Sequence, residues 1–115
     1  MEPSQVFNKI VRDKIPEIIQ SEGRSVEIKT LNDEEALVYL KKKLSEEVDE
    51  FLLSQSLQEL ADIMEVVRAL ASALGSSASS VEKIRREKCV RNGAFARKIL
   101  LLSAGLAAKH GGVER

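Results

Sequence analysis

The sequence predicts a mainly α-helical fold, a packed helical bundle with an antiparallel central helix hairpin and at most a small two-stranded β element. Two long segments carry apolar residues at helical spacing, the short stretch "SQS" separates them, and capping patterns stand before both. The chain has 115 residues, the size of one domain. We therefore expect a single domain over residues 1–108 and a frayed tail over residues 109–115.

The first elements are short. Pro16 favours the first turn of a helix in "PEIIQSE", and Gly23 is placed to end it. The segment "RSVEIKTL" that follows alternates and is β-branched, which predicts a short strand. The segment "FARKILLL", residues 95–102, is also expected to be extended and could pair with residues 26–30.

The first long helix follows. Asn32 or Asp33 is suited to cap it, and it is expected to run to about Leu53. Its apolar side chains recur with helical spacing, at Leu37, Leu40, Leu44, Val48, Phe51 and Leu52.

Two further helices are predicted by patterns of the form Ser-x-x-Glu, which are typical of capping boxes. Ser56 and Glu59 open a helix that runs to about Leu74 and is apolar around most of its circumference, as expected of a helix with several neighbours. A second pattern begins at Ser79 and opens a helix that Gly93 could end.

Composition argues against a binder of nucleic acid polymers. The chain has 18 basic and 18 acidic residues, whereas affinity for nucleic acid comes largely from neutralised phosphates. Aromatic residues make up 3% and Trp is absent, so platforms for stacked bases are not expected.

Cysteine content and hydropathy indicate a cytoplasmic protein that does not enter a membrane. Cys89 has no second cysteine to pair with and is expected to fill the core. The histidine, His110, sits in the Gly-rich tail. The N-terminus lacks the apolar run of a signal peptide, and "ILLLSAGLAA" is too short to span a bilayer.

Two pairs of acids flank the break between the long helices. On a helical wheel Glu47 lies at the edge of the apolar face and Glu50 lies about 60° further round. Glu59 falls on the apolar face of the second helix, with Asp62 about 60° away. Because a short connection predicts antiparallel packing, the four carboxylates should converge near one end of the hairpin.

Such a cluster is unfavourable without a cation, because two like charges about 4 Å apart repel by roughly 4 kcal/mol at an effective dielectric near 20. Mg²⁺ prefers oxygen ligands and often joins carboxylates to substrate phosphates. The cluster contains no histidine or cysteine, which argues against zinc. The competing interpretation is a solvated acidic face in which Glu59 serves only as a capping acceptor. Glu46 and Asp49 are expected to point away from the cluster.

These motifs resemble a known family. "EEVDE" followed by "ELADI" is similar to the signature of the MazG-like all-α nucleoside triphosphate pyrophosphohydrolases. "FNKIVRDKIPEII" and "NGAFARKIL" resemble the opening and closing segments of one subgroup, the predicted house-cleaning phosphohydrolases. The resemblance covers about residues 7–102.

The resemblance implies a Mg²⁺-dependent enzyme, with Mn²⁺ as a substitute, that cleaves between the α- and β-phosphates of non-standard nucleotides. The products would be a nucleoside monophosphate and pyrophosphate. It implies metal ligands at Glu47, Glu50, Glu59 and Asp62, and assembly as a homodimer or a dimer of dimers. Either Glu47 or Glu50 is expected to take the proton of the attacking water.

Cations must also contact the phosphates, and the candidates are Lys9, Arg12, Lys14, Arg97 and Lys98. The run Lys41, Lys42 and Lys43 is interpreted as a solvated face. The chain departs from the family pattern at Asn92, where a basic residue is common. It departs again in the connection from Glu50 to Glu59, which is shorter than usual at eight residues.

Two alternative functions remain open. One is hydrolysis of phosphoribosyl-ATP by a similar fold and metal site, which the opening "VRDKIP" disfavours. The other is a non-enzymatic helical oligomer that binds a nucleotide or a protein. The sequence does not identify the base or sugar, the number of metal ions or the size of the oligomer.

Overall fold

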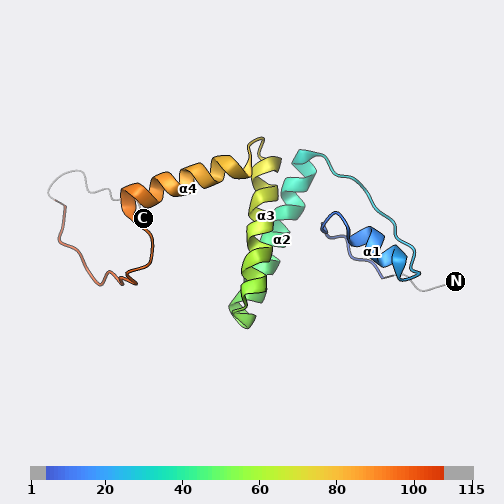
Figure 1. Ribbon diagram of the computed structural model, residues 1–115, viewed down its shortest axis with the longest axis horizontal. Helices are drawn as coiled ribbons and strands as arrows, with labels where there is room; N and C mark the ends of the chain where they lie inside the picture. Colours follow the sequence, from blue (N-terminus) through green and yellow to red (C-terminus); the bar gives the residue numbers. More distant parts are fainter. Residues whose placement is uncertain (1–4, 108–115) are drawn as a thin grey trace. The chain divides into compact units, whose positions relative to one another are not determined.

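The computed structural model describes residues 5–107 and is all-α there, which confirms the predicted fold class. The helices are labelled in Figure 1. In chain order they are α1 (Ile15–Ser21), α2 (Asp33–Ser54), α3 (Leu57–Ala73) and α4 (Ala78–Asn92).

The chain divides into two compact units. The first runs to Ala78 and holds α1, α2 and α3, and the second begins at Ser79 and holds the rest of α4. The single domain expected over residues 1–108 stays a prediction. The expected frayed tail, including His110, lies outside the described residues.

Helix α2 begins with a complete capping box. The Asn32 side chain accepts from the Glu35 N–H at 2.8 Å, and the Asn32 N–H donates to Glu35 Oε1 at 3.3 Å. Of the two predicted caps, Asn32 is therefore the one that forms, because it satisfies an N–H that the helix leaves unbonded. The helix ends at Ser54, and the C-cap residue Gln55, with a left-handed φ of 54°, turns the chain toward α3.

Helix α3 begins with only half of the predicted capping box. Ser56 Oγ accepts from the Glu59 N–H at 3.2 Å, as expected. The Ser56 N–H, however, donates to Ser54 Oγ at 3.3 Å. Because that donor is already satisfied, the Glu59 carboxylate has no capping role and is left for other contacts.

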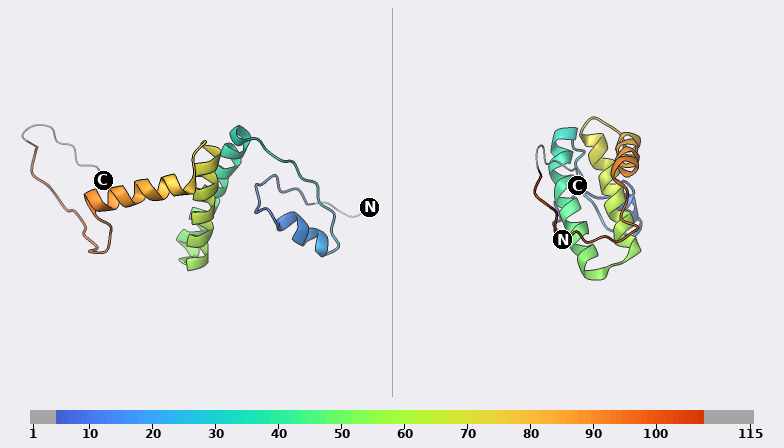
Figure 2. Two further views of the ribbon diagram at one scale, coloured as in Figure 1. Left: turned by 45° about the horizontal axis from the view of Figure 1, so that its top comes forward. Right: turned by 90° about the vertical axis from the view of Figure 1, so that its left-hand side faces the viewer.

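Helices α2 and α3 pack side by side as the predicted antiparallel hairpin (Figures 1 and 2). The buried apolar residues of the described chain are Leu40 on α2, and Val66 and Ala71 on α3. This core is small for the length of the two helices, and large apolar side chains such as Leu57 and Met64 are exposed.

The small β element that the sequence allowed does not form in the described part of the chain. Among residues 5–107 there is no strand, and residues 24–31 have no regular secondary structure. A two-stranded element is marginal in water unless a third strand or a helix covers it, so β-branched alternation alone does not produce one. The segment "FARKILLL", which was expected to be extended, instead contains a turn in which the Lys98 N–H donates to the Phe95 carbonyl at 3.0 Å.

The boundaries of α1 and α4 agree closely with those that the sequence predicts. Helix α1 has Pro16 in its first turn, and Gly23 follows it with a φ of 81°. Helix α4 begins at Ala78, so Ser79, predicted as its cap, lies in its first turn. Gly93, with a φ of 85°, closes α4 by donating to the Cys89 carbonyl at 2.8 Å.

Two further predictions concern the burial of Cys89 and the ability of a helix to span a membrane. Cys89 is a free thiol and is only partly buried, so it does not fill a core as predicted. None of the helices in the described part of the chain has the length and apolarity needed to cross a membrane.

Candidate metal centre

Three carboxylates meet near the closed end of the hairpin. Glu47 and Glu50 come from α2 and Glu59 comes from the first turn of α3. One oxygen from each residue lies within 4.8 Å of the others. The spacing of three residues puts Glu47 and Glu50 on one side of α2, and the short turn brings the start of α3 beside them.

Two oxygens of this cluster are buried without a hydrogen-bond partner. They are Glu47 Oε2 and Glu59 Oε2. Glu47 is 5% exposed and is the buried charged residue of the described chain. Buried polar atoms are normally satisfied, and an unsatisfied carboxylate oxygen is costly. Oxygen donors left in this state fit a hard divalent cation such as Mg²⁺.

The third acid, Glu50, is exposed, and its pKa is affected by both neighbouring acids. The negative charge of Glu47 is the main reason that the pKa of Glu50 is raised above its ordinary value. Burial and hydrogen bonding with Glu47 add to this rise in pKa, as do the charge and hydrogen bonding of Glu59. The cluster therefore favours a bound proton or cation at this position.

Lys43 is the cation in direct contact with the cluster. Its Nζ lies 3.2 Å from Glu47 Oε1, and its side chain is only 27% exposed. The prediction that Lys43 belongs to a solvated face is therefore wrong. The spacing of four residues between Lys43 and Glu47 was the available signal, since it brings the two side chains together on one helix face. Lys41 is exposed, and Lys42 lies 5.0 Å from the centre of the Tyr39 ring.

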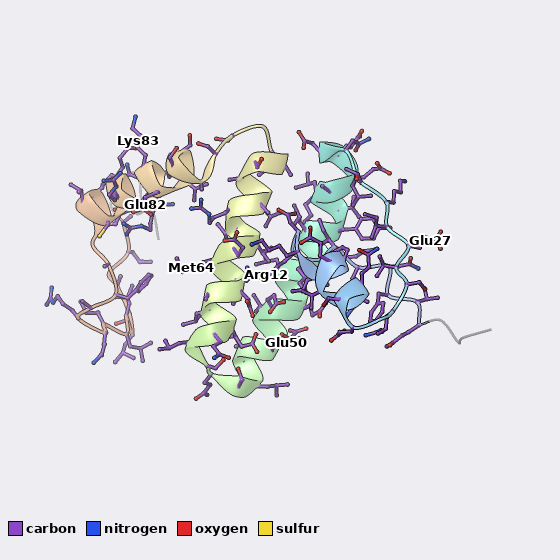
Figure 3. All side chains as sticks on the ribbon, turned by 45° about the vertical axis from the view of Figure 1, so that its right-hand side comes forward. Arg12, Glu27, Glu50, Met64, Glu82 and Lys83 are labelled. Atoms are coloured by element: carbon purple, nitrogen blue, oxygen red, sulfur yellow. The ribbon has the colours of Figure 1, made fainter. Side chains whose placement is uncertain are left out.

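Asp62, the fourth predicted ligand, is not part of the group. Its Oδ1 lies 2.7 Å from Nη2 of Arg12, which comes from the segment before α1. Arg12 was expected to bind phosphate, and in this structure it binds an acid. Figure 3 labels Arg12, which reaches the hairpin from the N-terminal segment, and Glu50, nearer the turn that joins α2 to α3.

The remaining predicted cations are spread along the chain. Lys9 Nζ lies 3.2 Å from Glu46 Oε1, so Glu46 pairs with the N-terminal segment, and it is not one of the three grouped acids. Lys14 is exposed at the N-cap of α1. Arg97 and Lys98 are exposed in the second unit. Their contacts with phosphate stay predictions.

A pocket of about 210 Å³ lies along the middle of α2. Residues 7–10 line one part of it, and Tyr39, Lys42, Lys43 and Glu46 line the rest. Lys43 belongs both to this pocket and to the ion pair with Glu47. The pocket is therefore adjacent to the acid cluster.

Comparisons with known proteins add a short similarity. No protein-family model and no solved structure matches the chain. A protein of Mycolicibacterium smegmatis, described only as uncharacterized, is 50% identical over 42 residues. That stretch covers 36% of this chain and 43% of the relative, less than half the length of either. This similarity establishes neither a family nor an activity.

Proposed function

We propose that the chain is a Mg²⁺-dependent nucleoside triphosphate pyrophosphohydrolase that cleaves the α–β phosphate link of non-standard nucleotides. The observation that carries the proposal is the pair of buried, unpartnered oxygens of Glu47 and Glu59 beside Glu50. The motifs "EEVDE" and "ELADI", which resemble the MazG-like signature, support it.

Each of the three acids has a part in this proposal. Glu47 and Glu59 would hold the ion, Mg²⁺ or Mn²⁺, through their unpartnered oxygens. When bound, the ion would neutralise phosphate oxygens and lower the pKa of a water molecule. Glu50 is exposed and has a raised pKa, so it is the better candidate than Glu47 to accept the proton of that water.

The adjacent pocket suits the nucleoside end of such a substrate. Phe7 and Tyr39 are two of the four aromatic residues of the chain, and both line this pocket. Aromatic faces favour a planar base. Lys43, shared by the pocket and the cluster, would then lie between the base and the metal-bound phosphates.

The proposed assembly is a homodimer or a dimer of dimers in the cytoplasm. Apolar side chains of the hairpin are exposed in the single chain, among them Leu53 at 90% and Leu57 at 82%. Surfaces of this kind commonly mark contacts between proteins. The same observation also favours the second candidate, a helical oligomer that binds a nucleotide or protein without catalysis.

The test is pyrophosphate release from a panel of standard and non-standard nucleoside triphosphates and phosphoribosyl-ATP, with saturating Mg²⁺ and with a chelator. We expect Mg²⁺-dependent release from a nucleoside triphosphate, and preference for phosphoribosyl-ATP would favour the alternative enzyme. Glu50→Gln should reduce the rate by roughly a hundredfold or more, as loss of a group close to a metal does. Asp49→Asn is the matched control on the same helix. Absence of release from every substrate would leave the non-enzymatic oligomer.

A further inference from the structure

The ion pair between Arg12 and Asp62 joins two residues that the proposed chemistry needs separately. Arg12 carries a forked guanidinium suited to phosphate, and Asp62 is one helical turn from Glu59 on α3. In the structure their atoms lie 2.7 Å apart, so each is occupied by the other. Asp62 is thereby withheld from the group formed by the other three acids.

The ion pair between Arg12 and Asp62 is in contact with solvent. The side chains of Arg12 and Asp62 are 57% and 39% exposed, and an ion pair in contact with solvent contributes little stability. The spacing of three residues between Glu59 and Asp62 places both on one side of α3. Asp62 and Glu59 are therefore neighbours on the surface of the helix.

We propose that Arg12 and Asp62 form an exchangeable pair that couples anion binding to metal binding. A phosphate group takes the Arg12 guanidinium, and Asp62, once released, becomes the fourth carboxylate for the divalent ion. The inference rests on the proposed metal centre. Because such coupling is reciprocal, the divalent ion should also free Arg12 for the phosphate.

The metal half of the coupling is tested by titrating Mn²⁺ calorimetrically, without any phosphate present. Arg12→Gln should tighten Mn²⁺ binding by roughly two- to fivefold, the factor that the strength of an exposed ion pair allows. In an Asp62→Asn background the same change should have no effect. Arg68→Gln removes a comparable exposed pair with Glu65 on α3 and is the matched control.

The anion half is tested with inorganic pyrophosphate in the presence of a chelator. Asp62→Asn should tighten pyrophosphate binding relative to the unchanged protein, because it frees Arg12. Adding Arg12→Gln to that variant should remove the gain. Circular dichroism establishes that each variant is folded before its binding is compared.

The outcomes separate this inference from the proposed function. If Arg12→Gln tightens Mn²⁺ equally with Asp62 and with Asn at position 62, the effect is one of general charge and the exchange is rejected. The exchange is also rejected if Mn²⁺ binds the unchanged protein and neither variant differs from it. If Mn²⁺ binds none of the proteins, the proposed metal centre fails as well.

Discussion

Lys43 Nζ lies 3.2 Å from Glu47 Oε1, and this ion pair gives the buried carboxylate of Glu47 a counter-charge. One turn of α2 separates the two residues, so the contact is local. The side chain of Glu47 is 7% exposed, and its other oxygen, Oε2, has no partner. Lys43 therefore offsets part of the cost of burying Glu47, while Glu47 stays within reach of Glu50 and Glu59.

Removing Lys43 should destabilise the protein. In Lys43→Met the stem is kept and the charge is lost, which leaves Glu47 without its counter-ion. We expect the free energy of unfolding in chelator to fall by about 1 kcal/mol or more, less than for a fully buried pair because Lys43 is partly solvated. The measurement is the midpoint of urea unfolding. Lys41→Met, an exposed change on the same helix, is the control, and an equal effect of both would contradict the prediction.

Metal should stabilise the folded protein through the three acids. At a Mg²⁺ concentration of about 100 times the dissociation constant, the free energy of unfolding should rise by about 2.7 kcal/mol. Glu47→Gln and Glu59→Gln should each lose most of this gain, because each removes an unpartnered oxygen. Thermal melting of each protein with Mg²⁺ and with chelator measures the stabilisation by the ion.

Asp49→Asn should keep the gain from Mg²⁺, since Asp49 is exposed and outside the cluster. Glu46 is a poorer control, because its carboxylate already pairs with Lys9. A stabilisation by Mg²⁺ that survived both Glu47→Gln and Glu59→Gln would place the ion elsewhere.

The raised pKa of Glu50 predicts a dependence of stability on pH. A carboxyl whose pKa is higher in the folded state binds its proton more tightly there than in the unfolded chain. Ionised Glu50 therefore destabilises the metal-free protein above the folded pKa, and this effect vanishes as the pH falls below the unfolded pKa. Glu50→Gln should be more stable than the unchanged protein at about pH 7.5, with the gap closing toward about pH 4.

Urea unfolding in chelator at several pH values measures that gap. Glu35 and Glu82, whose pKa values are lowered by Lys29 and Arg85, have the opposite dependence on pH. Both are present in the two proteins, so their contributions cancel in the difference. A gap between Glu50→Gln and the unchanged protein that does not change with pH would show that Glu50 does not feel the charge of Glu47.

The exposed apolar side chains of the hairpin predict self-association. Leu57 and Met64 on α3 are 82% and 67% exposed, and Leu74, the C-cap of this helix, is 67% exposed. A homo-oligomer, most simply a dimer, would cover them. Light scattering should give a mass of at least twice 12.7 kDa. Met64→Glu should lower that mass by placing a charge in the contact, whereas a monomer that is unchanged on dilution would reject the prediction.

The sequence alone was sufficient to predict the helices and the meeting of three of the four acids. Asn32, Ser56 and Gly93 act on backbone groups within a few residues, so their effects can be recognised from local spacing. The meeting of Glu47, Glu50 and Glu59 was also predictable, because helical periodicity and a short turn determine it. The contact between Lys43 and Glu47 could also have been predicted from helical periodicity, because the two residues are four positions apart.

Only the tertiary structure decided the partner of Asp62 and the state of Glu59. Arg12 and Asp62 are 50 residues apart, and no periodicity relates the N-terminal segment to a face of α3. Glu59 is free of its capping role because the Ser56 N–H donates to Ser54 Oγ, a detail of how the turn closes. Local patterns predict hydrogen bonds within one segment. The pairing of Arg12 with Asp62 depends instead on how the N-terminal segment packs against the hairpin.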